Sequence, residues 1–466
     1  MSVASLMNIK LMRNQLSSFS FTHKHLLACG YFILLLVPFV IAESLGMLSE
    51  GIYNNVLSLL NLLAMMAFFV QFPLAGRLKN IPLFSNVDWG MTKHKQFGKY
   101  LGIFFFLHPL LILAPKILLS FNDIEISIVS VITSPQLLTG LIAWAVMVIW
   151  VLMSIYKDQL TIRYETWRLL HVIGFAVIAT LATFHITSVG SHGQYDQAFN
   201  LMWWSLYSLS MALVIYNYFI KPRSIRKQPF IVNSVNKVSD CDWELTIEST
   251  SKKRFAFEPG QFAWINSSHS AFNLEQHPFS IVSHQDNHAQ LSFLIRELGD
   301  YTATLGQLEI GQKVYVDGPY GSMKLAQSIK APGITLIAGG AGIAPMLSLL
   351  NGFIKQNETR PIRLIYSNIH LQRMVGLTEL MMQDQLADFQ LQLLCEQVDN
   401  CSDALAPYVV EGRIGKEHIM KTINTDQEKD WVIYLSGPKG MINATVKNLK
   451  QLGLPANHIH FEQLSF

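Results

Sequence analysis

The chain has 466 residues, of which half are hydrophobic and only 14% are charged, and its mean hydropathy is positive. This composition is too apolar for an ordinary soluble protein and too polar for a fully embedded one, so it favours a membrane half joined to a soluble half. The formal net charge of +3 is too small to indicate nucleic-acid binding. The four cysteines show no C-x-x-C pair or iron–sulfur spacing, which excludes an iron–sulfur module and gives no disulfide framework.

Six apolar runs of roughly twenty residues, the length that crosses the hydrocarbon core of a bilayer, fill the first half of the chain. They cover residues 26–48, 56–74, 97–119, 137–155, 169–189 and 201–220. Lys and Arg are concentrated in the N-terminal segment 1–25 and in the even-numbered connections, which are the segments expected on the cytoplasmic side. We therefore expect a multi-pass protein of the cell (inner) membrane with a cytoplasmic N-terminal segment and both termini cytoplasmic.

Four histidines stand at matching places in the third and fifth helical segments, His94 and His108 in one and His171 and His185 in the other. Each pair is fourteen residues apart, close to four helical turns, so both imidazoles of a pair lie on nearly one helix face, roughly 20 Å apart. A lone intramembrane histidine is commonly just packed and hydrogen-bonded. Polar groups in lipid are costly, however, and two equal spacings favour a functional role for all four.

Two such helices side by side offer two levels, each with one imidazole from each helix. Bis-histidine ligation of a b-type haem needs two ligands per level, whereas a zinc site needs more ligands around one ion. The spacing therefore predicts two haem irons, one held by His94 and His171 near the cytoplasm and one by His108 and His185 nearer the far surface. This arrangement resembles the ferric reductase-like membrane domain shared by NADPH oxidases and ferric-chelate reductases, and the resemblance implies a six-helix domain with two haems over residues 26–222.

The pattern changes after Lys221-Pro222, which we expect to end the sixth helix. Residues 243–248 and 291–296 alternate in strand fashion, and Pro259-Gly260 is a turn signal. Short strands separated by turns predict a small antiparallel β-barrel over residues 228–326.

Beyond residue 330 strands alternate with helices, which predicts an α/β domain over residues 330–466. The apolar strand 334–338 runs into Gly339-Gly340-Ala341-Gly342 and a helical stretch that contains Pro345. A backbone without side chains can approach a diphosphate, and the following helix directs its amides and its positive dipole end toward it. This context favours a dinucleotide site; the alternative is a tight strand–helix turn without a ligand.

Five blocks follow one another in the soluble half: HPFS at 277–280, IRELGDYT at 295–302, GPYG at 318–321, GGAGIAP at 339–345 and SGPKG at 436–440. In this order they resemble the flavin- and pyridine-nucleotide-binding half of ferredoxin reductase-type proteins, most closely the version fused to NADPH oxidases. The resemblance covers nearly the whole chain after residue 20. It implies a multidomain membrane protein with a six-helix all-α bundle, an antiparallel β-barrel FAD domain and an α/β nucleotide-binding domain.

The resemblance also assigns individual flavin contacts. The residues placed along the flavin are His277, Pro278, Phe279 and Ser280, with the Ser280 side chain near the reactive edge of the isoalloxazine. The residues placed at the FAD diphosphate are Arg296, Gly299, Tyr301 and Thr302. Phe466 matches the aromatic residue that covers the flavin where nicotinamide must land; the alternative is a frayed tail.

The nucleotide site departs from the family in two places. Ser436-Gly437-Pro438 stands where the family usually has Cys-Gly-Pro, so a hydroxyl replaces a thiol near nicotinamide. A carboxylate that soluble relatives often carry near the end is absent, and we expect Glu462 to point elsewhere. Hydride transfer depends mainly on stacking and distance, so the candidate catalytic residues carry no acid or base role. These candidates are Ser280, Ser436 and Phe466.

The choice of coenzyme depends on the end of the second parallel strand. Ser367 stands there and Arg373 follows, with no acidic residue between them. A hydroxyl and an arginine favour the 2′-phosphate of NADPH, whereas an acidic residue favours the ribose of NADH. We therefore expect NADPH rather than NADH, with Ser367 and Arg373 as its contacts.

Taken together, the resemblance implies an electron conduit from cytosolic NAD(P)H through FAD and two b-type haems to an acceptor beyond the membrane. That acceptor is oxygen, giving superoxide, or a ferric chelate. Oxidases of the family often carry a further histidine where this chain has Ile112, which mildly favours another acceptor or reaction at a bare haem edge. Two alternatives stay open: a cytochrome b and flavoprotein subunit that passes electrons to a partner protein, and an oxygenase reductase anchored by unrelated spans.

Overall fold

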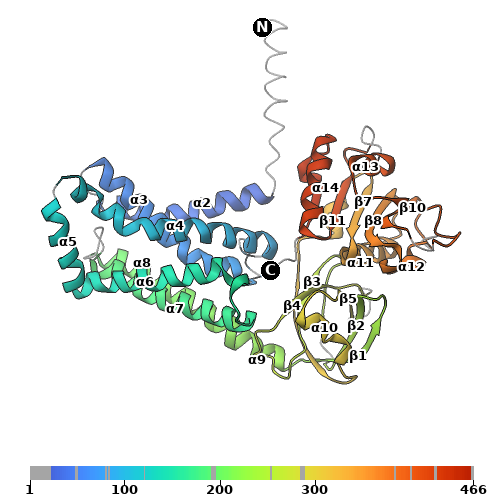
Figure 1. Ribbon diagram of the computed structural model, residues 1–466, viewed down its shortest axis with the longest axis horizontal. Helices are drawn as coiled ribbons and strands as arrows, with labels where there is room; N and C mark the ends of the chain where they lie inside the picture. The colour runs from blue at the N-terminus through green and yellow to red at the C-terminus, as the bar shows by residue number, and fades with distance from the viewer. Residues whose placement is uncertain are drawn as a thin grey trace, which may run out of the picture. The chain divides into compact units, whose positions relative to one another are not determined.

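The computed structural model describes residues 23–47, 51–78, 81, 84, 86–119, 121–189, 196–251, 254–283, 289–381, 385–398, 401–423 and 428–462 (Figure 1). The chain divides into two compact units. The first consists of residues 1–85, 93–160 and 171–211, and the second of residues 86–92, 161–170 and 212–466. Most of the N-terminal segment 1–25 and the predicted flavin cover Phe466 lie outside the described residues.

The six apolar runs form the helices α2 (His23–Ser44), α3 (Ile52–Ala75), α4 (Val87–Leu119), α6 (Pro135–Ile155), α7 (Tyr164–Val189) and α8 (Gln197–Ile215). All six are long and apolar enough to cross a membrane. α4 begins ten residues before its apolar run, because the side chain of Asn86 caps it by accepting the Trp89 amide at 3.0 Å. A further helix, α5 (Phe121–Thr133), lies between the third and fourth runs.

The sixth helix does not end at Lys221-Pro222 as predicted. It passes through a π-helical turn (Tyr216–Ile220) into α9 (Lys221–Arg226). Pro222 lies in the first turn of α9, where its ring and its missing amide hydrogen are tolerated. The prediction was wrong because a π-turn can precede a proline without ending the helix.

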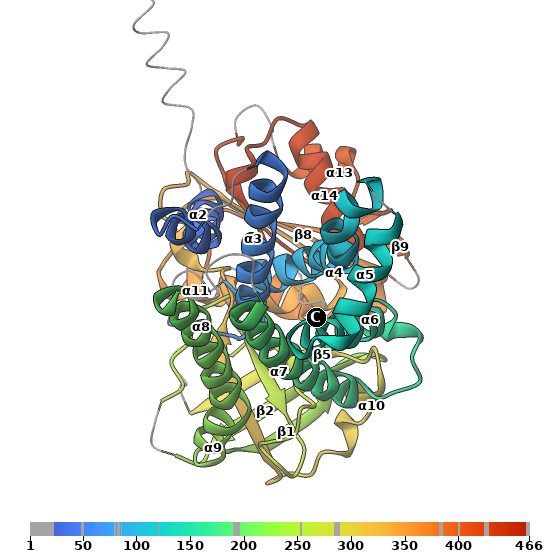
Figure 2. The same ribbon diagram turned by 90° about the vertical axis from the view of Figure 1, so that its left-hand side faces the viewer.

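Aromatic contacts define the neighbours among the helices of the bundle, whose ribbons are drawn in Figure 2. Phe68 on α3 packs on Phe175 of α7 with ring centroids 5.2 Å apart. Phe106 on α4 stacks on Trp144 of α6 at 6.2 Å. α3 is the helix with buried residues along most of its length, from Ser58 to Leu74. The bundle thus places α3 and α6 beside the two histidine-bearing helices α4 and α7.

The second unit contains an antiparallel six-stranded sheet. Its strands are β1 (Phe230–Lys237), β2 (Asp242–Ser249), β3 (Phe262–Asn266), β4 (His277–Ser280), β5 (Gln290–Arg296) and β6 (Lys313–Tyr320), in the order β4-β3-β6-β1-β2-β5. A bridge between Ile281 and Phe293 joins the two ends of this order, so the sheet closes on itself around buried residues such as Leu245 and Leu291. This confirms the antiparallel domain predicted from the sequence.

A parallel six-stranded sheet completes the second unit. Its strands are β7 (Ile334–Gly339), β8 (Ile362–His370), β9 (Phe389–Gln397), β10 (Val409–Glu411), β11 (Val432–Ser436) and β12 (Ile459–Phe461), in the order β10-β9-β8-β7-β11-β12. The accompanying helices are α11 (Ile343–Lys355), α12 (Leu377–Met381), α13 (Lys416–Thr422) and α14 (Lys439–Gln451). From β7 the chain continues to β8 on one side and later returns to β11 on the other. The strand order therefore reverses beside β7, where open α/β sheets bind ligands at the carboxyl ends of their strands.

Candidate functional site

Helices α4 and α7 bring two of the four predicted histidines face to face. The ring centroids of His94 and His171 lie 6.1 Å apart, and the ring planes make an angle of 76°. Two metal–imidazole bonds of about 2 Å on opposite sides of one ion, with the ring radii added, give centroids roughly this far apart. The separation fits an iron ion held from both sides by these two rings.

Hydrogen bonds determine which nitrogen of each of these two rings carries the proton. The Nδ1 atom of His94 lies 3.0 Å from the carbonyl oxygen of Gln71, which can only accept, so Nδ1 donates. The Nδ1 atom of His171 lies 3.0 Å from the hydroxyl of Ser154, whose own hydrogen goes to the Trp150 carbonyl at 2.8 Å. His171 therefore donates as well. In both rings the lone pair stands on Nε2, which is the protonation state that a metal-ligating imidazole needs.

The second predicted pair, His108 and His185, shows related features. The Nδ1 atom of His108 lies 3.1 Å from the Oδ1 atom of Asn61 on α3, so this ring also donates from Nδ1. His185 lies against the backbone of α6 at Gly140, where any side chain would overlap the imidazole. Glycine at position 140 therefore makes the room that the His185 ring occupies.

Two residues on α6 repeat the spacing of the histidines that they face. Gly140 and Ser154 are fourteen residues apart, and they face His185 and His171, which are also fourteen residues apart on the antiparallel helix α7. Trp150 adds a stack on the His171 ring, with centroids 4.5 Å apart and planes at 14°. These residues were missed from the sequence, although the repeated interval of fourteen in the fourth apolar run was a signal that could have found them.

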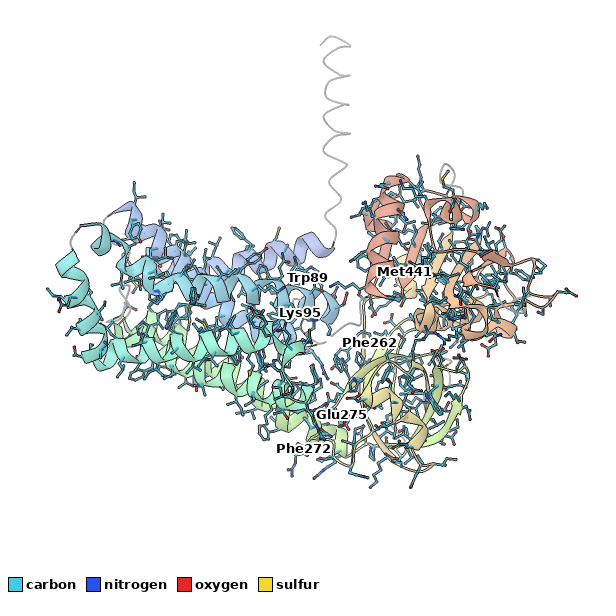
Figure 3. All side chains as sticks on the ribbon, in the orientation of Figure 1. Trp89, Lys95, Phe262, Phe272, Glu275 and Met441 are labelled. Carbon is cyan, nitrogen blue, oxygen red and sulfur yellow. The ribbon has the colours of Figure 1, made fainter. Side chains whose placement is uncertain are left out.

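The barrel brings the aromatic residues predicted to lie along the flavin together with Tyr301, which was predicted at the FAD diphosphate. The His277 ring stacks on Tyr301 with centroids 4.1 Å apart, and Phe279 lies 6.3 Å from Tyr301 with nearly parallel planes. Burial raises the pKa of Tyr301 to about 12 and lowers that of His277, so both rings are neutral near pH 7. Pro278 and Ser280 pair across to β3 with Trp264 and Phe262, the latter labelled in Figure 3. The four residues of this block thus form one edge of the barrel.

The residues predicted at the FAD diphosphate are held by protein groups. Arg296 on β5 forms a two-pronged ion pair with its cross-strand neighbour Asp242, through Nε at 2.9 Å and Nη2 at 3.0 Å. Its third nitrogen, Nη1, reaches the glycine loop, where it would overlap any side chain at Gly340. The amide of Gly299 donates to the Thr302 hydroxyl at 3.0 Å. Arg296 therefore has one nitrogen directed at the nucleotide loop, while Asp242 anchors the rest of its guanidinium.

The glycine loop and the Ser436-Gly437-Pro438 segment meet at the carboxyl ends of β7 and β11. A side chain at Gly342 would overlap the Ser436 carbonyl, and one at Gly339 would overlap Met441, which is labelled in Figure 3. Gly340 and Gly437 have positive φ angles of 55° and 156°. Close packing of two loop backbones thus requires these glycines, and it leaves their amides at the strand-order reversal. Pro345 is buried in the first turn of α11, where proline is tolerated.

The predicted coenzyme-selecting residues lie at the end of β8. Ser367 pairs with Gly339 across the sheet, which places it beside the glycine loop. Arg373 donates from Nε to Asp240 at 3.1 Å, and both side chains are well exposed. The Arg373 hydrogen bond lowers the pKa of Asp240, so that carboxylate is ionised near pH 7. A 2′-phosphate would have to compete with Asp240 for this arginine.

Glu462 is buried beneath the loop that follows the GPYG block. Its carboxylate accepts hydrogen bonds from the amides of Ser322 and Met323, the latter at 3.0 Å. Burial raises its pKa to about 7. The side chain therefore holds the loop 321–323 in place, a contact that the sequence did not indicate.

Comparison with known families matches three parts of the chain in order. Residues 56–182 match the ferric reductase like transmembrane component, residues 233–324 an FAD-binding domain, and residues 336–447 an oxidoreductase NAD-binding domain. The multi-pass membrane part and the two nucleotide-binding domains expected from the sequence are confirmed by these matches.

Curated relatives match the soluble half. The reductase component of propane 2-monooxygenase from Mycolicibacterium smegmatis is 27% identical over 230 residues, which is 47% of this chain and 63% of that protein. The toluate 1,2-dioxygenase electron transfer component from Pseudomonas putida is 27% identical over 238 residues, 50% of this chain and 66% of that protein. NADH-cytochrome b5 reductase 1 from Laccaria bicolor is 28% identical over 182 residues, 38% of this chain and 57% of that protein. The chain thus spans less than two thirds of the length of these relatives.

Proposed function

Since the chain matches the ferric reductase and NADPH oxidase family through three domains in order, we propose that it is a transmembrane electron carrier. It takes electrons from NAD(P)H on the cytoplasmic side and delivers them to an acceptor on the far side, either oxygen or a ferric chelate. The observation that carries the proposal is the pair His94 and His171, with rings 6.1 Å apart and both Nδ1 atoms donating to protein oxygens.

In this proposal His94 and His171 hold one b-type haem, and His108 and His185 hold the other, within a membrane domain over residues 26–222. When bound, the haems supply one-electron chemistry, and FAD converts the two-electron hydride donor into single electrons. The protein keeps the lone pairs of the ligands on Nε2 by binding the Nδ1 hydrogens of three of these imidazoles. It also leaves room beside α6 for the fourth ring.

The barrel, over residues 228–326, would hold FAD. His277, Phe279 and Tyr301 supply a neutral aromatic wall for a flat ring system. The Nη1 of Arg296, which Asp242 does not bind, the amides after Gly299 and the Thr302 hydroxyl would supply donors for its diphosphate. Ser280 is buried at the same edge, where its hydroxyl would face the reactive part of the flavin.

The α/β domain, over residues 330–466, would hold NADPH or NADH. The amides of the loop Gly339–Gly342 and the start of α11 would bind the diphosphate at the reversal of the strand order. Ser436, at the end of β11, would lie beside nicotinamide, and Ser367 with Arg373 would contact the adenosine end.

The most direct test of this function is the visible spectrum of dithionite-reduced membranes that contain the expressed protein. Haem held by two histidines should give sharp bands that carbon monoxide leaves essentially unchanged, because the two imidazoles would already occupy the places at which carbon monoxide could bind. The variant His108→Ala should lose the far-side haem while NADPH still reduces FAD. A preparation whose only chromophore is flavin would contradict the proposal.

The acceptor can be identified with the same purified protein supplied with NADPH and FAD. Reduction of cytochrome c that superoxide dismutase suppresses would identify oxygen as the acceptor. Turnover that begins only with ferric citrate would identify a metal reductase. Turnover with neither would indicate a cytochrome subunit that passes its electrons to a partner protein.

A further inference from the structure

Two side chains on different helices orient one ligand histidine at each haem level. Ser154 on α6 accepts from the Nδ1 atom of His171 at 3.0 Å, at the level near the cytoplasm. Asn61 on α3 lies 3.1 Å from the Nδ1 atom of His108, at the far level. At neither level is the acceptor on the helix that carries the histidine, so each hydrogen bond also ties two helices together.

The Ser154 hydroxyl has its direction set by a second hydrogen bond. Its hydrogen goes to the Trp150 carbonyl of its own helix at 2.8 Å, so a lone pair is what it presents to His171. Trp150 holds the same histidine in two further ways. Its ring stacks on the imidazole at 4.5 Å, and its Nε1 donates to the His171 carbonyl at 2.8 Å. Rotation of this imidazole is therefore opposed by both a hydrogen bond and an aromatic face.

We propose that Ser154 and Asn61 are positioning residues, one for each haem level, that fix the ligand tautomer and set the midpoint potential at that level. An oxygen that accepts the Nδ1 hydrogen makes an imidazole a better electron donor through Nε2. A better donor favours the ferric state, so removing the acceptor should raise the midpoint potential of that level alone. This inference rests on the proposed function.

A redox titration of the purified full-length protein, followed by visible absorbance, tests the proposal. Ser154→Ala should raise the midpoint potential of the inner haem and leave that of the outer haem unchanged. Asn61→Leu should raise the midpoint potential of the outer haem and leave that of the inner haem unchanged. A tenfold change in the ferric-to-ferrous ratio corresponds to a shift of about 59 mV for one electron. The two waves are assigned with His108→Ala, which retains only the inner haem.

Two further variants separate positioning from a merely structural role. Ser154→Thr keeps the hydroxyl and should restore the unsubstituted potential. Thr183→Val is the matched control on α7, because its hydroxyl donates to the Ala179 carbonyl at 2.7 Å. Thr183 is two positions from His185, about 200° around the helix, so it faces away from the ligand side. We expect Thr183→Val to leave both potentials unchanged.

Haem content and midpoint potentials together decide whether Ser154 and Asn61 position the ligand histidines. Loss of the inner haem in Ser154→Ala, but not in Ser154→Thr, would support the proposal as a potential shift would. Unmoved potentials in Ser154→Ala and Asn61→Leu, or equal shifts in Thr183→Val, would overturn it while leaving the proposed function intact. A haem-free unsubstituted protein would defeat the proposed function and this inference with it.

Discussion

The membrane bundle and the nucleotide-binding domains hold their candidate functional residues with different kinds of interaction. In the bundle, His94, His108 and His171 are oriented by a backbone carbonyl, an amide and a hydroxyl, all of them neutral. In the soluble half, Arg296 and Arg373 are held by carboxylates. The contrast follows from solvation, because a charge is far more expensive in lipid than a neutral dipole, whereas a soluble domain can bury a charge beside its counter-ion.

The largest effect on stability should come from breaking the buried ion pair of the barrel. Asp242→Asn would leave the Arg296 guanidinium without its counter-ion. Water cannot replace that counter-ion well, because the side chain at position 242 is fully buried and Arg296 is only 18% exposed. We expect a loss of about 3 to 5 kcal/mol in unfolding free energy. Thermal unfolding of the soluble domains in the full-length protein measures it.

The control for this prediction is an exposed ion pair in the same half of the chain. Lys324 donates to Glu258 at 3.0 Å, and the two side chains are 35% and 50% exposed. Glu258→Gln should therefore lower stability by less than about 1 kcal/mol. Equal losses in the two variants would show that burial does not govern these ion pairs.

The next largest effect is the dependence of stability on pH that Glu462 causes. The pKa of Glu462 is raised by burial from 4.5 to about 7, so the folded state binds a proton that the unfolded chain has already released between these values. The stabilisation of the folded state by this bound proton is complete below pH 4.5 and is lost as pH rises through 7. It amounts to roughly 3 kcal/mol. Glu462→Gln should flatten the stability profile over this window. A profile as steep as that of the unsubstituted protein would locate the titration elsewhere.

A smaller effect is expected at Gly140, where the absence of a side chain makes room for the His185 imidazole. Gly140→Ala would push a methyl group into the His185 ring and should cost about 1 to 3 kcal/mol through overpacking. It should also reduce the haem content at the far level, which the reduced spectrum measures. Gly98→Ala is the control, because its methyl group would find only Gln71 Oε1, at 3.9 Å. Haem loss in both variants would point to general disturbance of the bundle.

The smallest effect concerns the exposed ion pair at the end of β8. Asp240→Asn would release Arg373 for a 2′-phosphate, so the KM for NADPH should fall by less than about fivefold while that for NADH stays unchanged. The fall should be weaker at high salt, which already screens the pair. Equal changes in the KM values for NADPH and NADH would show that Arg373 does not bind the 2′-phosphate.

The membrane bundle and the soluble half also differ in what could be predicted from their sequences. Helical periodicity converts an interval of fourteen residues into a distance along one face, so His94, His108, His171 and His185 could be placed without knowing their neighbours. Asn61 and Ser154 could not, because the residue that lies opposite a histidine depends on how adjacent helices slide against one another.

In the sheets, motif blocks located Arg296 and Ser436 but not their surroundings. The partner Asp242 lies across a strand pair whose register is visible only in the structure. The continuation of the last membrane helix into α9 was predicted wrongly, since a π-turn before Pro222 leaves no clear mark in the sequence.

The central claim is that two levels in the bundle each hold a haem through one imidazole from α4 and one from α7. The ratio of haem to protein in the purified chain tests this claim most directly. We predict two haems per chain, falling to one in His108→Ala and in His94→Ala, with flavin content unchanged in each variant. A ratio of zero, or a ratio that neither substitution lowers, would contradict the account.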